Sequence, residues 1–512
     1  MLKPKKKYRD TKKIGLALGP LMFCIILFFF HPEGLSYEAN AVLASTVWIA
    51  IWWITEAIPI AVTSLLPVIL FPLTGGLSLN ETTVSYGHRY IFLYIGGFIL
   101  AIAIERWNLH KRIALTIINI IGANIKSIIL GFMVATAFLS MWISNTATTV
   151  MMLPIGMAIV AQLRDNPKTI ENENLIFGKS LMLAIAYSAS IGGVATLIGT
   201  PPNLVLAGVV EEFYGIEISF SEWMMFGLPV SVLLLFICWK YLTGYAFKFE
   251  QTTFPGGKTE IKKQLDFLGK ITFEEKTVLV VFISTAIAWI ARSPVQKLIK
   301  SLYANPEHFE NSLFSNLDDT IIALIAGIVL FLLPTSKEKG RKIINWDEAL
   351  KLPWGILLLF GGGLALAQGF KISGLAAWIG SQLTLLEGVS LILLLLILIA
   401  AVNFLTEITS NLATTAMILP ILAPLALEIN VHPFILMVGA TVAASCAFML
   451  PVATPPNAVV FGSGYLKIYD MVKVGIWMNV VSILLLTLIT YFLLPFLWNF
   501  DPWTIPANLM NR

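Results

Sequence analysis

Two short polar segments each occur twice within long apolar stretches of the chain. The first pair is Ser-Asn-Thr at 144–146 and Ser-Asn-Leu at 410–412, and the second is Thr-Pro-Pro-Asn at 200–203 and at 454–457. Hydroxyl, amide and carbonyl oxygens are hard ligands that suit a cation such as Na⁺. Asn NH₂ and Thr OH groups near a helix N-terminus can donate hydrogen bonds to a carboxylate. The four segments are therefore candidates for binding both a cation and an organic anion.

The prolines of the second pair predict breaks in their helices. Proline lacks a backbone N–H and clashes with the preceding turn, so Thr200-Pro201 and Thr454-Pro455 should interrupt helix and free carbonyl groups. Within a membrane, such irregular backbone is tolerated only where it is buried in protein or lines a wet cavity. Small polar residues and proline kinks also occur at ordinary helix contacts, but the duplication of the whole set favours a function.

Charge is missing from these segments. No Lys, Arg or His lies near the two Ser-Asn steps or in either Thr-Pro-Pro-Asn segment, so an anion would meet no cationic side chain there. Bound Na⁺ could supply that charge. Because an isolated charge in a low dielectric is costly, the anion and the cation would favour each other's binding, which is a physical basis for coupled transport.

The composition predicts a polytopic membrane protein. Of 512 residues, 57% are hydrophobic and only 12% are charged, whereas soluble domains carry about 25% charge. Mean hydropathy is +0.82, and apolar runs of about 20 residues, long enough to cross a bilayer, recur along the chain. Cys24, Cys238 and Cys446 all lie in apolar runs and are odd in number, which favours packing roles over disulfides or a metal site.

Apolar run length predicts eleven spans and two re-entrant hairpins. The hairpins are 127–160 and 389–425, each interrupted near its middle by a Ser-Asn step. The spans lie near 14–30, 41–57, 59–76, 90–105, 181–198, 223–245, 277–292, 319–335, 353–371, 434–452 and 474–497.

The distribution of charge predicts the orientation in the plasma membrane. With eleven crossings, 28 of the 34 Lys and Arg fall on the side of the N-terminus, which the positive-inside rule makes cytoplasmic. The net charge of +4 thus reflects topology, and no nucleic-acid partner is expected. The basic segment 1–13 has no small-residue cleavage site after it and is interpreted as the start of a retained first helix.

The two halves of the chain are related. Residues 144–155 match 410–421 at nine of twelve positions with an offset of 266, and the same offset pairs Gly96-Gly97 with Gly362-Gly363. The predicted span 353–371 comes five spans after its equivalent, the span 90–105. An odd number inverts the second copy, which is the inverted-repeat plan of secondary transporters.

The sequence disfavours two other classes of function, an enzyme and a channel. A membrane-embedded enzyme is disfavoured because the five histidines fall in predicted loops or at span ends, with no nucleophile–base or metal-ligand spacing. A channel is disfavoured because two inverted broken-helix repeats build one occluded site more naturally than an open pore. Glu407, three residues before Ser410, is either a coupling carboxylate or a local cap.

Four long segments carry a family resemblance: SMWISNTATTVMMLP (140–154), TSNLATTAMILPI (409–421), FMLPVATPPNAVVFGSG (448–464) and WWITEAIPIAVTSLLP (52–67). They resemble the divalent anion/sodium symporter family, the INDY-type di- and tricarboxylate transporters, and the similarity runs from about residue 40 to 480. The resemblance implies an all-α homodimer with an elevator mechanism, in which a transport domain slides against a dimerising scaffold.

That resemblance implies a division of the chain. An N-terminal anchor and scaffold helices would occupy 1–124, and the first half of the transport domain 125–222. Scaffold helices of the second repeat with cytoplasmic loops would follow at 223–388, the second transport half at 389–470, and a C-terminal helix and tail at 471–512.

The resemblance also implies the site residues. The first sodium site would use Ser140, Ser144, Asn145 and the Gly199 carbonyl, and the second Thr406, Ser410, Asn411 and the Ala453 carbonyl. Substrate carboxylates would meet Asn145, Thr146, Thr200, Asn411 and Thr454, with Pro201 and Pro455 shaping the breaks. One departure matters, because Leu412 stands where the family's commonest pattern has Thr, and a hydroxyl donor is thereby lost.

The expected function is Na⁺-coupled symport of C4-dicarboxylates such as succinate, malate or fumarate into the cell, with no enzymatic activity. Citrate or sulfate symport and sodium-independent dicarboxylate exchange are the alternatives. At Leu412, either the substrate carboxylate is held differently from the first half, or the side chain faces away and packs against the other arm of its hairpin.

Overall fold

The computed structural model describes residues 6–122, 124–162, 172–249, 257–303, 312, 314–336, 338, 340–382 and 388–505. The described residues form helices and contain no strand, and Pro334 and Lys342 form an isolated bridge. Ser or Asn caps with a Glu three residues later fix several helix starts, for example at Ser78, Ser219 and Asn345. The prediction of an all-α protein is confirmed for the described residues.

The helices follow one another in four groups along the chain. The first comprises α1 (Lys6–Phe29), α2 (Tyr37–Thr55), α3 (Ile60–Thr63), α4 (Leu66–Thr74) and α5 (Leu79–Val84). The second comprises α6 (Arg89–Arg106), α7 (Leu109–Ile121), α8 (Ile125–Ser140), α9 (Asn145–Gln162), α10 (Glu173–Val194), α11 (Pro201–Tyr214) and α12 (Phe220–Tyr241).

A third group comprises α13 (Gly257–Phe267), α14 (Phe273–Leu302), α16 (Asp319–Leu332) and α17 (Trp346–Ala349). The last comprises α18 (Trp354–Ile372), α19 (Leu375–Gln382), α20 (Leu391–Thr406), α21 (Asn411–Glu428), α22 (Pro433–Ala444), α23 (Pro455–Phe461), α24 (Ile468–Leu488) and α25 (Leu494–Trp498).

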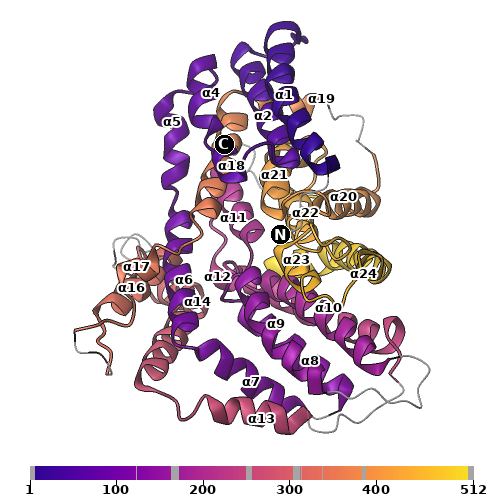
Figure 1. Ribbon diagram of the computed structural model, residues 1–512. Helices are drawn as coiled ribbons and strands as arrows, with labels where there is room; N and C mark the ends of the chain where they lie inside the picture. Colours follow the sequence, from indigo (N-terminus) through magenta and orange to yellow (C-terminus); the bar gives the residue numbers. More distant parts are fainter. Residues whose placement is uncertain are drawn as a thin grey trace.

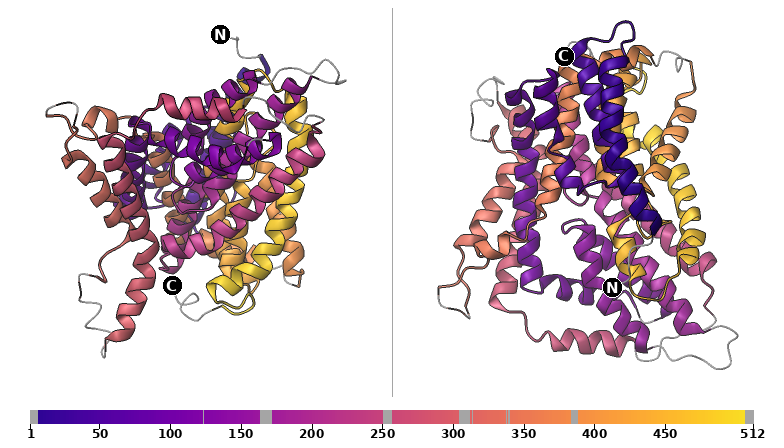
Figure 2. Two further views of the ribbon diagram at one scale, coloured as in Figure 1. Left: turned by 90° about the horizontal axis from the view of Figure 1, so that it is seen from below. Right: turned by 45° about the horizontal axis from the view of Figure 1, so that its top comes forward.

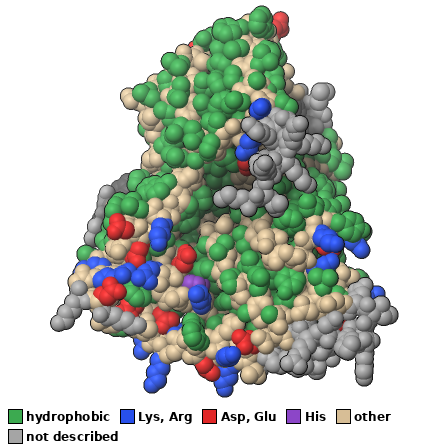
Figure 3. Space-filling view, in the orientation of Figure 1, with side chains coloured by type: hydrophobic (Ala, Val, Ile, Leu, Met, Phe, Trp, Pro, Cys, Tyr) green, Lys and Arg blue, Asp and Glu red, His purple; other side chains and the backbone are tan. Residues whose placement is uncertain are grey.

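Membrane-spanning character is widespread among these helices. Eight helical stretches of the described residues are long and apolar enough to cross a bilayer, and five shorter apolar helical stretches accompany them. Figure 3 shows that apolar side chains cover most of the face it presents, while charged side chains gather along its lower part, over α7, α13 and α17. The chain is therefore an integral membrane protein.

The spans predicted from hydropathy need correction at several places. The span at 59–76 is not one helix, because α3 ends at Thr63 and α4 starts at Leu66, with Pro67 in its first turn. The spans at 181–198 and 434–452 end early, at Val194 and Ala444. Beyond each break lies a further helix, α11 or α23, that hydropathy did not separate from its loop.

Each of the two predicted re-entrant hairpins corresponds to a pair of helices joined by a short turn, and their re-entry from one face of the membrane stays a prediction. α8 and α9 are joined through residues 141–144, and α20 and α21 through 407–410. α9 starts at Asn145 and α21 at Asn411, the same step of 266 residues that separates the repeated sequences. Both Ser-Asn steps thus lie at a helix start, where the first backbone N–H groups have no partner within the helix.

The elements are arranged in two groups in space. Figure 1 shows α8, α9, α10, α20, α22, α23 and α24 on one side of the molecule and α5, α6, α14 and α16 on the other. In the left view of Figure 2 the two ends of the chain lie at opposite faces, and α13 lies near the face that carries the N-terminus.

Candidate functional site

The first hairpin tip brings three oxygen atoms together. Ser140 Oγ lies 2.6 Å from Asn145 Oδ1 and 2.7 Å from the carbonyl oxygen of Ala189. A hydroxyl group has one proton, so Ser140 can donate to only one of these two acceptors. The cluster is therefore short of protons, which is the situation that a bound cation relieves.

The second hairpin tip repeats this arrangement. Thr406 Oγ1 lies 2.7 Å from Asn411 Oδ1 and 3.0 Å from the carbonyl oxygen of Ala444. Thr406 and Ser140 are fully buried, so water does not reach their side chains. In both halves a buried hydroxyl from the last turn of one hairpin arm faces an Asn oxygen from the first turn of the other.

The amide nitrogens of the same two Asn residues remain available. Neither Asn145 Nδ2 nor Asn411 Nδ2 has a hydrogen-bond acceptor among the described residues, although both Oδ1 atoms are engaged. An Asn side chain can thus face a cation with its oxygen and donate its N–H groups to an anion on the other side.

The helix breaks are held by the Asn of each Thr-Pro-Pro-Asn segment. Asn203 Nδ2 lies 3.2 Å from the carbonyl oxygen of Gly193 and 2.8 Å from that of Thr196. Asn457 Nδ2 lies 3.3 Å from the Ala447 carbonyl oxygen and 3.0 Å from that of Leu450. Each residue of the second pattern lies 254 positions after its counterpart in the first. Both Asn side chains are fully buried. These two Asn residues fix the irregular backbone.

A glycine allows the first tip to approach its break. A Cβ atom on Gly193 would lie 2.5 Å from Asn145 Oδ1 and 3.1 Å from the Gly199 carbonyl oxygen. The first of these distances is shorter than any ordinary contact of a Cβ atom, so only glycine fits here without a shift of Asn145. The structure therefore brings Asn145 and the Gly199 carbonyl, two expected ligands of the first sodium site, to the same place.

Helices from the two halves of the chain pack against each other. α9, which starts at Asn145, packs against α23, and α21, which starts at Asn411, packs against α11. Each hairpin arm thus contacts the helix that follows the break of the other half. The starts of α9, α11 and α21 carry the partial positive charge of helix N-termini, so these helix starts can attract an anion without a cationic side chain.

The expected substrate residues differ in exposure. Thr146 is exposed, whereas Thr200 and Thr454 are buried. Thr454 Oγ1 accepts a hydrogen bond 3.3 Å long from the backbone N–H of Asn457. Pro201 is half-buried and Pro455 exposed. Leu412 is 5% exposed and belongs to the hydrophobic core. Thr146 and Leu412 therefore occupy unlike environments, although their positions correspond in sequence.

Glu407 anchors the second break. Its carboxylate accepts hydrogen bonds 2.8–2.9 Å long from the backbone amides of Phe448, Met449 and Leu450, and one of 2.8 Å from Asn479 Nδ2. Of the two roles left open by the sequence, this geometry is that of a cap, but the amides that Glu407 caps lie about forty residues further along the chain and are not local. Sequence reasoning missed Asn479 on α24, although a polar residue inside an apolar span was a signal for it.

Comparisons with known proteins agree with this geometry. The family model described as the sodium:sulfate symporter transmembrane region matches residues 11–498. The sodium-dependent dicarboxylate transporter SdcS of Staphylococcus aureus (strain bovine RF122 / ET3-1) is 50% identical over 502 residues, covering 98% of this chain and 94% of the relative. SdcS of Staphylococcus saprophyticus is 50% identical over 500 residues, covering 96% and 93%.

Two solved structures share the fold at low sequence identity. MtrF of Neisseria gonorrhoeae, described with antimetabolite efflux pumps, has a TM-score of 0.60 at 13% identity and covers 97% of this chain and 98% of its own. The YdaH transporter of Alcanivorax borkumensis has a TM-score of 0.55 at 12% identity, covering 97% and 99%. At such identities the likeness concerns the fold alone.

Proposed function

The chain belongs to the sodium:sulfate symporter family, and we propose that it is a Na⁺-coupled symporter that brings C4-dicarboxylates such as succinate, malate and fumarate into the cell. Relatives that are 50% identical over nearly the whole chain are named sodium-dependent dicarboxylate transporters. Symport of dicarboxylate with sodium is thus the activity of the group, and the C4 preference is our proposal.

The observation that carries sodium coupling is the pair of proton-poor oxygen clusters at the hairpin tips. A Na⁺ ion accepts several oxygen ligands and needs no proton from them. We assign the first sodium to Ser140, Ser144, Asn145 and the Gly199 carbonyl, and the second to Thr406, Ser410, Asn411 and the Ala453 carbonyl.

The substrate then binds between the two sodium ions. Its carboxylates accept hydrogen bonds from the Asn145 and Asn411 amides and from Thr146, Thr200 and Thr454, near the starts of α9, α11 and α21. Since those groups carry no full positive charge, the anion depends on both Na⁺ ions for electrostatic stabilisation. Binding of the substrate without sodium is therefore weak, and this dependence couples the two fluxes.

Transport follows an elevator mechanism in a homodimer. The two hairpins and broken helices, at 125–222 and 389–470, move as one body against scaffold helices that form the dimer contact. The separation of α8–α10 and α20–α24 from α5, α6, α14 and α16 in Figure 1 supports this division. The related halves are inverted with respect to each other.

We place the N-terminus in the cytoplasm, and single cysteines test this topology. Lys263→Cys and Lys342→Cys should react with a membrane-impermeant thiol reagent only from the cytoplasmic side, and Glu212→Cys only from outside. Two features support the orientation: the eleven predicted spans place 28 of the 34 Lys and Arg on the N-terminal side, and the chain ends lie at opposite faces. Labelling of Lys263→Cys from outside would overturn it.

Competition experiments test the substrate class. Malate should displace labelled succinate more strongly than citrate, sulfate or acetate.

Thr146→Leu removes an exposed hydroxyl at the first tip and should weaken dicarboxylate uptake about ten- to a hundredfold, because one hydrogen bond to a charged carboxylate contributes about 1.5–3 kcal/mol.

Leu412→Thr is the matched control for that change. Because Leu412 is buried in the core, the substitution should lower the unfolding free energy by about 1–3 kcal/mol and leave the order of competitors unchanged. A Leu412→Thr protein that melts normally but discriminates more sharply against acetate would instead place this side chain at the substrate.

A further inference from the structure

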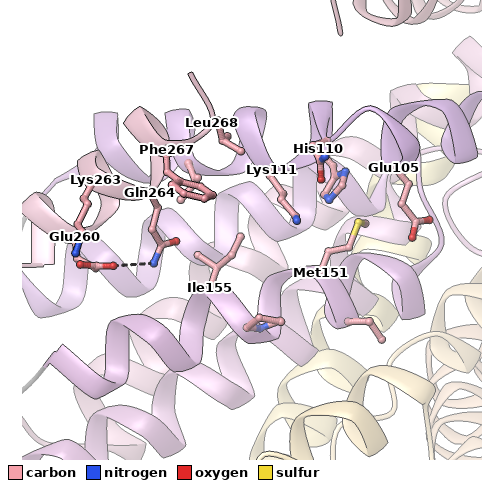
Figure 4. A pocket seen from close by; sticks show the side chains of 14 residues that line it. Glu105, His110, Lys111, Met151, Ile155, Glu260, Lys263, Gln264, Phe267 and Leu268 are labelled. Carbon is pink, nitrogen blue, oxygen red and sulfur yellow. Dashed lines mark hydrogen bonds between the residues drawn. The ribbon is translucent and has the colours of Figure 1, made fainter. Parts of the chain in front are cut away.

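A cavity of about 810 Å³ lies away from the residues assigned to sodium and substrate. It is bounded by α7, α9 and α13 (Figure 4). α13 lies near the face that carries the N-terminus (Figure 2), which is the cytoplasmic face in the topology proposed above. α7 and α13 are short amphipathic helices that do not meet the length and composition of a span, and such helices lie in the membrane interface.

The walls of the cavity are largely apolar. Leu115, Met151, Ile155, Phe267 and Leu268 contribute to them, and Phe267 is 91% exposed at the end of α13. At the membrane interface, lipid hydrocarbon can cover an exposed aromatic side chain that lies beside an apolar cavity. The cavity is therefore suited to a ligand with an acyl chain.

The polar groups of the cavity carry balanced charge. Lys111 and Lys263 have no ion-pair partner among the described residues, nor does Glu105, while Glu260 accepts a hydrogen bond 3.3 Å long from Gln264. In Figure 4, Lys111 lies between Lys263 on one side and His110 and Glu105 on the other. The ligand head should therefore present a negative group to the lysines and a positive one to Glu105.

His110 adds a specific requirement. Its side chain is 3% exposed, and its Nδ1 lies 3.2 Å from the Ile104 carbonyl oxygen, so Nδ1 carries the proton. Burial lowers the pKa of His110 to about 4, so the ring is neutral at pH 7 and its Nε2 atom can only accept. That Nε2 atom is buried and has no partner among the described residues. Because His110 lines the cavity and buried acceptors are almost always paired, we expect the ligand to supply a donor.

We propose that this cavity binds a phosphatidylethanolamine molecule of the cytoplasmic leaflet. The phosphate lies between Lys111 and Lys263, the ammonium group donates N–H bonds to His110 Nε2 and Glu105, and an acyl chain covers the apolar wall. An anionic lipid would leave Glu105 unpaired. Phosphatidylcholine has the same two charges but no N–H donor, so it cannot satisfy His110.

Such a lipid would touch the machinery of transport without being part of it. α9 begins at Asn145 and lines the cavity one to three turns later, through Met151 and Ile155. The lipid thus bridges α13 and an arm of the first hairpin, and its binding should stabilise the protein against unfolding. Neither the binding nor this stabilisation depends on the proposed substrate.

The test compares phosphatidylethanolamine with phosphatidylcholine, which differs from it only in the ammonium group, and with an anionic lipid. Purified full-length protein in detergent is titrated with dioleoyl phosphatidylethanolamine, dioleoyl phosphatidylcholine and dioleoyl phosphatidylglycerol, and bound lipid is counted by native mass spectrometry alongside melting curves. Phosphatidylethanolamine should bind about tenfold more tightly than phosphatidylcholine, since a hydrogen bond from a charged donor is worth at least that factor, and it should raise the melting temperature more.

Matched variants locate the site. His110→Asn can keep an N–H for the Ile104 carbonyl but removes the Nε2 acceptor, so the preference for phosphatidylethanolamine should fall to about twofold or less. Lys263→Ala should weaken both zwitterionic lipids, whereas Lys262→Ala, exposed on the same helix and outside the cavity, should change neither. If His110→Asn does not fold, Glu105→Gln on the exposed rim makes the same comparison.

Three outcomes would overturn the proposal. They are equal binding of phosphatidylethanolamine and phosphatidylcholine by the native chain, an undiminished preference in His110→Asn or Glu105→Gln, and tighter binding of phosphatidylglycerol than of phosphatidylethanolamine. The last would show an anion site in place of a zwitterion site.

Discussion

Replacing Asn145 or Asn411 with Ala is expected to reduce Na⁺-dependent succinate uptake more than about a hundredfold while changing the melting temperature little. Each side chain gives its oxygen to a proton-poor cluster, and its amide nitrogen has no acceptor among the residues that the structure describes. Loss of either contact to a charged group costs about 1.5–3 kcal/mol, and both are lost together. The fold is spared because Ser140 and Thr406 each keep a backbone carbonyl as acceptor.

Asn203→Ala and Asn457→Ala are the controls, because they remove the same side chain from the neighbouring segments. These two amides hold the broken backbone through hydrogen bonds to carbonyl groups in the fully buried interior. Each substitution should leave buried carbonyls unpaired and lower the unfolding free energy by about 1–3 kcal/mol. The controls should therefore lose stability, and the tip variants should lose transport.

Labelled-succinate uptake with and without Na⁺, measured beside melting curves of the four purified variants, separates these effects. Sodium-dependent uptake that survives in both tip variants would remove Asn145 and Asn411 from the site. A loss of stability at the tips equal to that of Asn203→Ala would make their role structural.

The tips and breaks could be predicted because their signals are local. A Ser-Asn step inside an apolar stretch favours a helix start, and Pro201 and Pro455 stop the preceding helix. The structure accordingly starts α9 at Asn145 and α11 at Pro201. Duplication of these signals at fixed offsets made the assignment of equivalent residues possible from sequence alone.

Contacts between distant residues could not be predicted in this way. Glu407 caps amides at 448–450, about forty residues further on, and one sequence carries no signal for that pairing. Leu412 corresponds to Thr146 in sequence, yet it is packed in the core, because its exposure is set by neighbours on other helices. Hydropathy alone also passed over α7 and α13, whose polar faces dilute the apolar signal.

The most direct test of sodium-coupled symport is uptake of labelled succinate into proteoliposomes that contain the purified chain and an imposed sodium gradient. With Na⁺ outside and K⁺ inside, succinate should accumulate above its external concentration. The accumulation should collapse when Na⁺ is equal on both sides, because no sodium gradient across the membrane then drives the anion inward. Empty liposomes and Asn145→Ala protein serve as controls. Uptake that is unchanged when K⁺ replaces external Na⁺, or that occurs only in liposomes preloaded with a dicarboxylate, would contradict symport and indicate sodium-independent exchange.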